Sequence, residues 1–294
     1  MGVESRIATV ARTWTPTQRL HPGNVAWHET GCDGAPPTDL TLGGEGWYAD
    51  VWRGQRGAVD DVDAHFSPEL PEEARASIVR QVRDAVPRGS ISLVTGSAMA
   101  YAVLASGAVE ERGPFFLLQH RRLDGLEPLA PPAGYEVVRA GKAGEAVRVE
   151  AHRRAWDPAR IKRLLGLPVT GDEPSSSFSA SRYRALREVS VYRPELDLVA
   201  LTPDGAPAAF ALGWYDERSR SVLFEPVGSS PDHARRGLSR ALCTAVMTAA
   251  CELGATQAVV GPRGDDAYPA PRALYGSLGF SSVARTGTLT WGRS

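Results

Sequence analysis

The sequence lacks the features of a membrane or secreted protein. Its 294 residues contain no apolar run near the roughly 18–20 residues that span a bilayer. The first residues do not have the charged-then-apolar layout of a signal peptide, so none is expected. Lysine occurs only as Lys142 and Lys162, and 33 basic residues face 34 acidic ones, which leaves a net charge of −1. That balance gives no electrostatic reason to expect binding to nucleic acid or to an anionic membrane surface.

Cysteine is scarce, with only Cys32, Cys243 and Cys251 in the chain. The last two fall on one expected helix, about 12 Å apart by helical rise, which is too far for a disulfide. Neither the cysteines nor the histidines have the spacing of metal ligands, and no Ser-His-Asp or Cys-His arrangement is evident. We therefore expect reduced thiols in a cytoplasmic protein that needs no metal ion.

A proline-rich stretch divides the chain. Residues 127–134 contain Pro128, Pro131 and Pro132, which stiffen the backbone and disfavour regular structure. The stretch separates residues 1–126 from residues 135–294, and each part is long enough for one hydrophobic core. We therefore predict two domains joined by a linker.

The second part alternates strands and helices in an order that predicts a mixed α+β sheet. A Pro-Asp-Gly turn at 203–205 predicts that its second and third strands form a hairpin. The expected strands are 135–139, 196–201, 208–215, 222–227 and 257–261, and the expected helices are 144–156, 181–188, 240–253 and a short one within 273–280.

The most informative segment follows the strand 222–227. It reads Pro231-Asp-His-Ala-Arg-Arg-Gly-Leu-Ser239 and leads into a long apolar helix. Gly237 has no Cβ, so the backbone there can approach a ligand closely. The unpaired N–H groups of the helix start and three nearby cations form a candidate anion site suited to a diphosphate. These cations are Arg235, Arg236 and Arg240. A basic helix start on a solvated surface is the alternative.

This segment resembles the GNAT superfamily of acyl-CoA N-acyltransferases. The family's pyrophosphate loop has the form Gln/Arg-x-x-Gly-x-Gly/Ala between a strand and a helix. Ala234-Arg-Arg-Gly237-Leu-Ser239 resembles it and departs from it at Ala234 and Ser239. The closing Leu274-Tyr-Gly-Ser-Leu-Gly-Phe280 resembles the family's second signature, in which a tyrosine precedes Leu-Gly-Phe. The resemblance covers roughly residues 196–291.

The resemblance implies that acetyl-CoA is the co-substrate and that its acetyl group passes directly to a primary amine. It also implies that strand 222–227 splays from its neighbour, so that backbone groups there bond the pantetheine arm. We expect a small-molecule amine as acceptor, no nucleic acid or membrane partner, and a monomer or homodimer. The residues expected to contact CoA are Val227, Gly228, Ser229, Arg235, Arg236, Gly237, Leu238, Ser239 and Arg240.

Glu225 lies in an otherwise apolar strand and is the candidate general base. Two-residue alternation predicts that it shares a face with Val227 and Ser229. Apolar surroundings would raise the pKa of its carboxyl group toward a useful value. An ion pair with an arginine of the turn and recognition of the substrate ammonium are the alternatives. The resemblance implies that Tyr275 protonates the departing thiolate, and a core tyrosine bonded to backbone is the alternative reading.

The first part of the chain repeats the order of elements of the second. The expected strands are 46–52, 59–66, 90–94 and 115–119, and the expected helices are 72–85 and 98–105. We therefore predict a tandem of two GNAT-like α+β domains, each a mixed, mostly antiparallel sheet flanked by helices. An unrelated α+β domain with the same order of elements is the alternative for residues 1–126.

The first part lacks the anion turn. Pairing Pro68 with Pro231 places Ala74 at the position of Gly237. The residues at the positions of the two arginines are Glu72 and Glu73. Because glutamates would repel a diphosphate, we expect no cofactor site in this degenerate domain.

The sequence thus predicts an acetyl-CoA-dependent N-acetyltransferase. A CoA-binding pseudoenzyme with a regulatory or structural role is one alternative. An acyltransferase that uses a longer acyl-CoA, or an oxygen nucleophile, is another. The polar loop 170–179 and the groove between the domains are expected to shape the acceptor site, and their composition does not name the acceptor.

Overall fold

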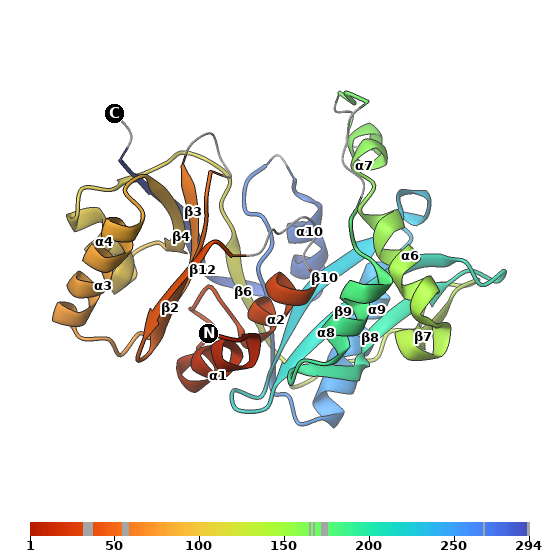
Figure 1. Ribbon diagram of the computed structural model, residues 1–294. Helices are drawn as coiled ribbons and strands as arrows, with labels where there is room; N and C mark the ends of the chain where they lie inside the picture. Colours follow the sequence, from red (N-terminus) through yellow and green to blue (C-terminus); the bar gives the residue numbers. More distant parts are fainter. Residues whose placement is uncertain are drawn as a thin grey trace.

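The computed structural model describes residues 1–31, 38–54, 59–164, 166, 168–171, 176–266 and 268–292. Cys32 and residues 172–175 of the polar loop lie outside the described residues. We call residues 1–126 the N-terminal half and residues 135–294 the C-terminal half. Figure 1 shows one half at each end of the molecule, joined through strands that cross the middle.

The described strands form one sheet with the order β1-β2-β3-β4-β12-β6-β11-β10-β9-β8-β7, and β5 pairs with β12. Their bounds are β1 (Leu40–Gly44), β2 (Trp47–Trp52), β3 (Asp60–Phe66), β4 (Gly89–Val94), β5 (Val109–Glu110), β6 (Leu117–Arg122), β7 (Glu136–Arg139), β8 (Tyr192–Leu201), β9 (Pro207–Asp216), β10 (Ser221–Ser229), β11 (Gln257–Val260) and β12 (Ser281–Trp291).

Helices cover both faces of the sheet (Figure 1). Their bounds are α1 (Val3–Thr13), α2 (Pro22–Thr30), α3 (Glu72–Ala85), α4 (Ala98–Ala105), α5 (Ala140–Ala143), α6 (Glu145–Ala155), α7 (Pro158–Leu164), α8 (Ala180–Arg187), η1 (Pro231–His233), α9 (Leu238–Glu252) and α10 (Ala270–Ser277). Within the described ranges, every helix is too short or too polar to span a lipid bilayer.

The two halves exchange strands in the centre of the sheet. β6, from the N-terminal half, pairs antiparallel with β11 of the C-terminal half. β12, at the end of the chain, pairs antiparallel with β4 of the N-terminal half. β6 and β12 also pair with each other. Each half is therefore completed by a strand that the other half contributes.

The same unit of structure occurs twice, as the sequence predicted. An antiparallel strand pair, a crossover helix and a parallel partner strand form β2-β3-α3-β4 in the N-terminal half. The corresponding unit in the C-terminal half is β9-β10-α9-β11. The expected helices and strands of both halves are present within a few residues of their predicted bounds, and the α+β class is confirmed. The sequence did not predict α1, α2, β1 or β12.

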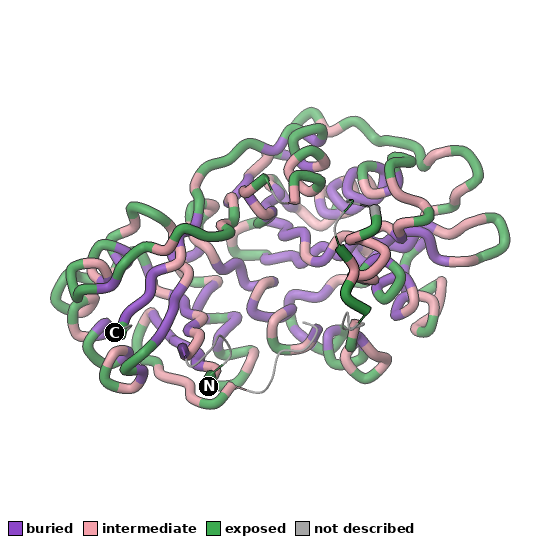
Figure 2. The backbone as a smooth tube through the Cα atoms, turned by 90° about the horizontal axis from the view of Figure 1, so that it is seen from above, coloured by how far each residue is buried: buried purple, intermediate pink, exposed green. Residues whose placement is uncertain are grey.

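The N-terminal helices pack on the C-terminal half. Apolar side chains of α1 and α2, among them Val10, Val25 and Trp27, share one core with Phe210 and Trp214 of β9. The opposite face of the same strands forms a second core with α9 and α10. The buried backbone runs through the sheet strands of both halves (Figure 2). The first thirty residues, which belong to the N-terminal half in sequence, thus form part of a core with strands of the C-terminal half.

A buried ion pair joins α6 to β8 inside the first of these cores. Arg148 and Asp197 are both 0% exposed, and Arg148 Nε donates to Asp197 Oδ1 at 2.6 Å. The hydroxyl groups of Tyr183 and Tyr192 donate to the other carboxylate oxygen at 3.0 and 3.3 Å. The guanidinium carbon lies 4.3 Å from the ring centroid of Phe210. The charge of Arg148 is therefore balanced by a single carboxylate, and aromatic side chains surround the guanidinium group.

We expect Asp197→Asn to lower the free energy of unfolding by about 3–5 kcal/mol, because it leaves the Arg148 charge buried without a counter-charge. The double variant Arg148→Met/Asp197→Asn removes that charge and keeps an acceptor for both tyrosines. It should lose less stability than the single variant. Urea unfolding of all three proteins measures the difference, and equal losses would show that the buried charge is not the cause.

Candidate active site

The strand β10 separates from β11 where the resemblance led us to expect it. The two strands are paired only over Ser221–Leu223 and Gln257–Val259. Beyond that point β11 ends at Val260, while β10 continues to Ser229 and stays paired with β9 on its other side. A gap therefore opens beside the backbone of residues 227–229, and an extended ligand arm could bond to it there.

The turn after β10 contains two residues with left-handed backbone. Gly237 caps α9 with φ +83°, and Arg235 has φ +60°. Both are in the left-handed region, which is costly for a non-glycine residue and is typical of ligand-binding turns. The side chains of Arg235, Arg236 and Arg240 are exposed. In the part of the chain that the structure describes, these three cations form no ion pair, so their charge is available to a ligand.

The other predicted cofactor residues lie around the same turn. Ser229 Oγ is 2.8 Å from Ser239 Oγ, which ties the end of β10 to the first turn of α9. Leu238 is buried in the α9 core, so only its backbone can face a ligand. A Cβ added at Gly228 would lie 2.7 Å from Ala155 Cβ, so this position needs glycine for the close approach of α6.

The predicted face of Glu225 is wrong. The pairing of β10 with β9 shifts by one residue between Phe224 and Val227, which is a β-bulge. Val227 packs against the α9 core, and Ser229 contacts α9 through Ser239. Glu225 instead contacts Asn24 of α2 on the opposite face. The extra residue in the bulge reverses the alternation of side chains between the two faces. Glu225 therefore does not share a face with Val227 and Ser229.

Glu225 accepts hydrogen bonds from residues of α2 and β9. The side-chain amide of Asn24 donates to Oε2 of Glu225, and the indole N–H of Trp214 donates to the backbone oxygen of Glu225 at 2.5 Å. Burial raises the pKa of the carboxyl group to about 7, against the opposing effects of the Asn24 hydrogen bond and the Arg19 charge. The carboxylate is therefore half protonated near neutral pH, which suits a general base. Among the described residues, Glu225 forms no ion pair with an arginine of the turn, which was one of the alternatives.

Tyr275 lies on the other side of β10. Its ring is 5% exposed and contacts Phe224 and Phe280, with ring centroids 6.4 and 5.6 Å apart. Burial raises the pKa of its hydroxyl well above the usual value, so the group is protonated throughout the physiological range. A tyrosine in this state can donate a proton and cannot serve as a base. Glu225 and Tyr275 thus lie on opposite faces of the sheet.

Polar residues of the N-terminal half surround the Glu225 side of the site. Arg19 forms an ion pair with Asp63 of β3, and His28 Nδ1 lies 3.2 Å from the second oxygen of Asp63. Burial lowers the pKa of Arg19 to about 10 and that of His28 to about 4, so Arg19 is charged and His28 is neutral at pH 7. We call these three residues the acceptor-side cluster. Among the described residues, no three His, Cys, Asp or Glu side chains are grouped as metal ligands.

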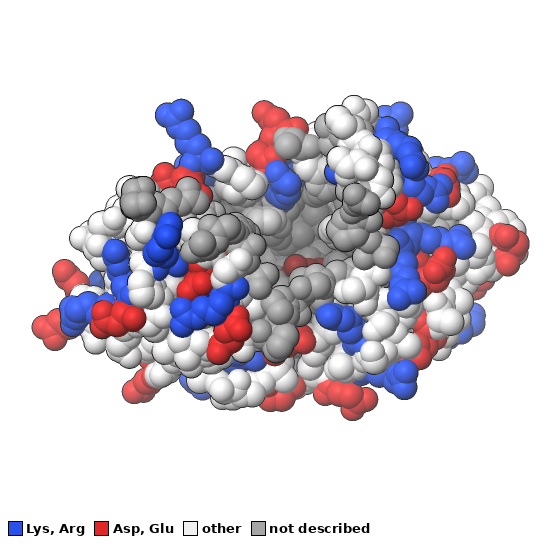
Figure 3. All heavy atoms as spheres, turned by 45° about the horizontal axis from the view of Figure 1, so that its top comes forward, with Lys and Arg blue, Asp and Glu red and all other residues white. Residues whose placement is uncertain are grey.

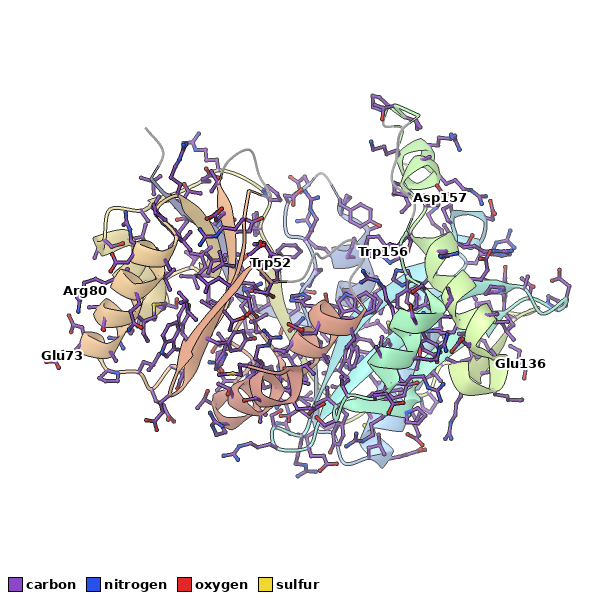
Figure 4. The ribbon with its side chains drawn as sticks, viewed as in Figure 1. Trp52, Glu73, Arg80, Glu136, Trp156 and Asp157 are labelled. Carbon is purple, nitrogen blue, oxygen red and sulfur yellow. The ribbon has the colours of Figure 1, made fainter. Side chains whose placement is uncertain are left out.

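A hollow lies between the two halves in the space-filling view (Figure 3). Charged side chains stand around it. Trp156, which follows α6, is 47% exposed and is seen on the side of the C-terminal half that faces the N-terminal half (Figure 4).

Sequence reasoning missed Asn24 and Arg19, although both act on Glu225. The residues are about two hundred positions away from Glu225 in the chain, and no local pattern connects them. The one available signal was Pro22 ahead of an apolar run, which is typical of a helix start. That signal could have predicted α2 but not its contact with β10.

No protein-family model matches the sequence, and none of the curated proteins is similar to it at a significant level. Solved structures do match. A tandem GNAT protein from the clavulanic acid biosynthesis pathway is 17% identical, with 99% of this chain and 95% of that chain covered and a TM-score of 0.59. A GCN5-related N-acetyltransferase from Sphaerobacter thermophilus is 19% identical, with coverages of 83% and 76% and a TM-score of 0.58.

A third similar structure is the C-terminal domain of a candidate lysylphosphatidylglycerol synthetase from Agrobacterium fabrum. It is 13% identical, with 99% of this chain and 91% of that chain covered and a TM-score of 0.57. At these identities the likeness is one of fold. The repeated strand-helix-strand unit and these matches together show that the chain has the fold of the GNAT N-acetyltransferases, with two such units in tandem.

Proposed function

We propose that the protein is an N-acetyltransferase that transfers the acetyl group of acetyl-CoA directly to a primary amine of a small molecule. The observation that carries this proposal is the position of Glu225. A carboxylate with a pKa near 7 stands at the point where β10 and β11 separate, next to a turn built for an anion. The gap lies between a base and a proton donor, which is the arrangement that amine acylation needs.

The residues of the gap and the turn fit CoA. The exposed, unpaired arginines Arg235, Arg236 and Arg240, with the N–H groups at the start of α9, would hold the diphosphate. The backbone of Val227, Gly228 and Ser229 would bond the pantetheine arm. Bound there, acetyl-CoA supplies an acetyl group activated as a thioester.

The chemistry follows from the two side chains. Glu225 accepts a proton from the ammonium of the acceptor, and the neutral nitrogen forms a C–N bond to the thioester carbonyl carbon. The C–S bond breaks and its electron pair leaves with sulfur. Tyr275 protonates that thiolate, since burial keeps its hydroxyl protonated. The nitrogen of the new C–N bond gives up its second proton to the tyrosinate, which restores the neutral hydroxyl of Tyr275. The products are an amide and free CoA, and protonated Glu225 releases its proton to solvent before the next turnover.

We further propose that residues 1–126 form a domain without a CoA site and that residues 135–294 form the catalytic domain. In the N-terminal half, α3 begins at Glu72 directly after Pro71, with Glu72 and Glu73 in its first turn. Figure 4 shows Glu73 and Arg80 on the outer surface of α3, at the opposite end of the molecule from Glu136. The acceptor-side cluster indicates that this half instead forms one wall of the acceptor site.

The first test concerns the turn. We expect Gly237→Leu to raise the Kd for CoA at least about tenfold, because a side chain blocks the backbone and strains its left-handed conformation. Gly205→Leu is the matched control, since Gly205 has φ +81° in an open hairpin turn away from the site. Isothermal titration with CoA should show weak binding only for Gly237→Leu. Equal affinities in the two variants would refute the site.

The second test concerns the number of sites. Titration of the intact chain should give one CoA per chain, because the glutamates at the start of α3 repel a diphosphate. Gly237→Leu should then leave no residual high-affinity binding. A stoichiometry of two, or one site that survives Gly237→Leu, would mean that the N-terminal half binds CoA.

The third test concerns the chemistry. Thiol release from acetyl-CoA, measured with a panel of amines, should rise with pH around a midpoint near 7, as Glu225 ionises. Glu225→Gln should lower turnover by about 10²–10⁴-fold with little change in CoA affinity. The exposed carboxylate Glu217 offers the control Glu217→Gln, which should behave as wild type. Binding of CoA without thiol release from any amine would favour a pseudoenzyme.

The same assay tests Tyr275. We expect Tyr275→Phe to lose turnover to a degree that depends on the acidity of the leaving thiol, because the hydroxyl proton goes to that thiolate. Donors whose thiols are more acidic should be affected least. Wild-type turnover in both Glu225→Gln and Tyr275→Phe would show that neither residue transfers a proton.

A further inference from the structure

The start of α2 is fixed onto the C-terminal half by close contacts. A Cβ added at Gly23 would lie 2.3 Å from Trp214 Cβ, so only glycine permits this approach of the helix. His21 Nδ1 accepts the backbone N–H of Gly23 at 2.9 Å, which makes Nε2 the protonated ring nitrogen. His21 Nε2 therefore donates to Ser221 Oγ of β10 at 2.9 Å. Burial lowers the pKa of His21 to about 3, so this neutral tautomer persists at any assay pH.

These contacts also fix the side-chain amide of Asn24. Its Oδ1 accepts the backbone N–H of His21 at 2.8 Å, in the capping box of α2. A backbone N–H can only donate, so the amide oxygen must face it and the NH₂ group must face Glu225. That NH₂ group donates to Glu225 Oε2. The other oxygen, Oε1, accepts no hydrogen bond from the described residues and is left for the acceptor amine.

The groups around the carboxylate come from several elements. Arg19, from the segment ahead of α2, acts on Glu225 while it is paired with Asp63 of β3. Tyr275 of α10 faces β10 from the opposite side, beside the buried thiol of Cys243 of α9, and burial keeps both groups protonated. Among the described residues, Arg19 is thus the one permanent charge that acts on Glu225. Asn24 is the one side chain among them that donates a hydrogen bond to the Glu225 carboxylate.

We propose that Asn24 is a positioning residue of the catalytic centre, which holds one oxygen of Glu225 from the N-terminal half and leaves the other for the amine. This inference rests on the proposed role of Glu225 as the base. A donor to the ionised carboxylate stabilises that form, so Asn24 also keeps Glu225 ionised at a lower pH than burial alone would allow. The N-terminal half is then a working part of the active site and not only a wall of it.

Asn24→Asp is the decisive variant. Asp keeps an oxygen that can accept the His21 N–H from the N3 position of the capping box, and a negative charge in the first turn of a helix is favourable. The one change is at Glu225, where a second carboxylate replaces a donor. Two carboxylates in contact cannot both ionise easily, so the Glu225 carboxyl should titrate at least about one pH unit higher than in wild type.

Ser221→Ala is the matched control. It removes the acceptor of His21, which is another contact between α2 and β10, and it touches no atom of Glu225. We expect Ser221→Ala to lower the melting temperature slightly and to leave the titration of Glu225 and the pH–rate profile unchanged.

Two measurements test the expected shift in the titration of Glu225. The first is carbon NMR of the full chain labelled at the glutamate carboxyl carbon, with Glu225→Gln to assign the Glu225 signal. The second is the pH dependence of kcat/KM for thiol release. In Asn24→Asp the midpoint of the acidic limb should rise with the NMR titration, so kcat/KM at pH 7 should fall at least about five-fold and recover at alkaline pH.

The possible outcomes test the role of Asn24 and the proposed role of Glu225 as the base separately. An unshifted Glu225 titration in Asn24→Asp would overturn the inference, even if the enzyme is fully active. A uniform loss of kcat/KM without a shift in its midpoint would also overturn it, because it would mean that Asn24 only holds α2 in place. A shifted titration together with full turnover in Glu225→Gln would support the placement of Asn24 and reject Glu225 as the base.

Discussion

The antiparallel pairing of β6 with β12 is the contact on which the geometry of the site depends. β6 also pairs with β11, and β12 also pairs with β4, so the two halves form one continuous sheet. Separating the halves would break hydrogen bonds in the middle of that sheet and expose two strand edges. The continuous sheet fixes α2 and β3 relative to β10. This is why Asn24 and Arg19 can reach Glu225 from the opposite half of the chain.

Two irregularities of one strand create the space for chemistry. The separation of β10 from β11 opens a gap that a regular parallel pair would close. Glu225 lies on the same face as Leu223, toward α2, and the bulge after Phe224 brings Val227 to the opposite face, toward α9. Glu225 therefore lies on the α2 face of the sheet, and Tyr275 lies on the α9 face. A regular strand would have placed Val227 on the same face as Glu225.

The sequence predicted the features that depend on residues close together in the chain. Apolar periodicity, the hairpin turn and the glycine at the start of α9 predicted most helices and strands. Charge and burial arguments predicted a raised pKa for Glu225, and the structure shows that rise. The bulge was not predictable, because it depends on pairing with β9. The strand exchange and the Asn24 contact were not predictable either, since non-local pairings leave no periodic signal in the chain.

The two copies of the same unit differ in how each begins its crossover helix. In the alignment that pairs Pro68 with Pro231, the residue that matches Leu238, the first of α9, is Arg75, yet α3 already begins at Glu72. The loop that could hold a diphosphate is thus part of the helix in the N-terminal half. Glutamates in the first turn stabilise a helix through its dipole, so they favour the fold at the position where an anion would otherwise bind. This difference leaves the structure of the N-terminal unit intact, and the N-terminal half contacts β10 of the other unit through Asn24 and Glu225.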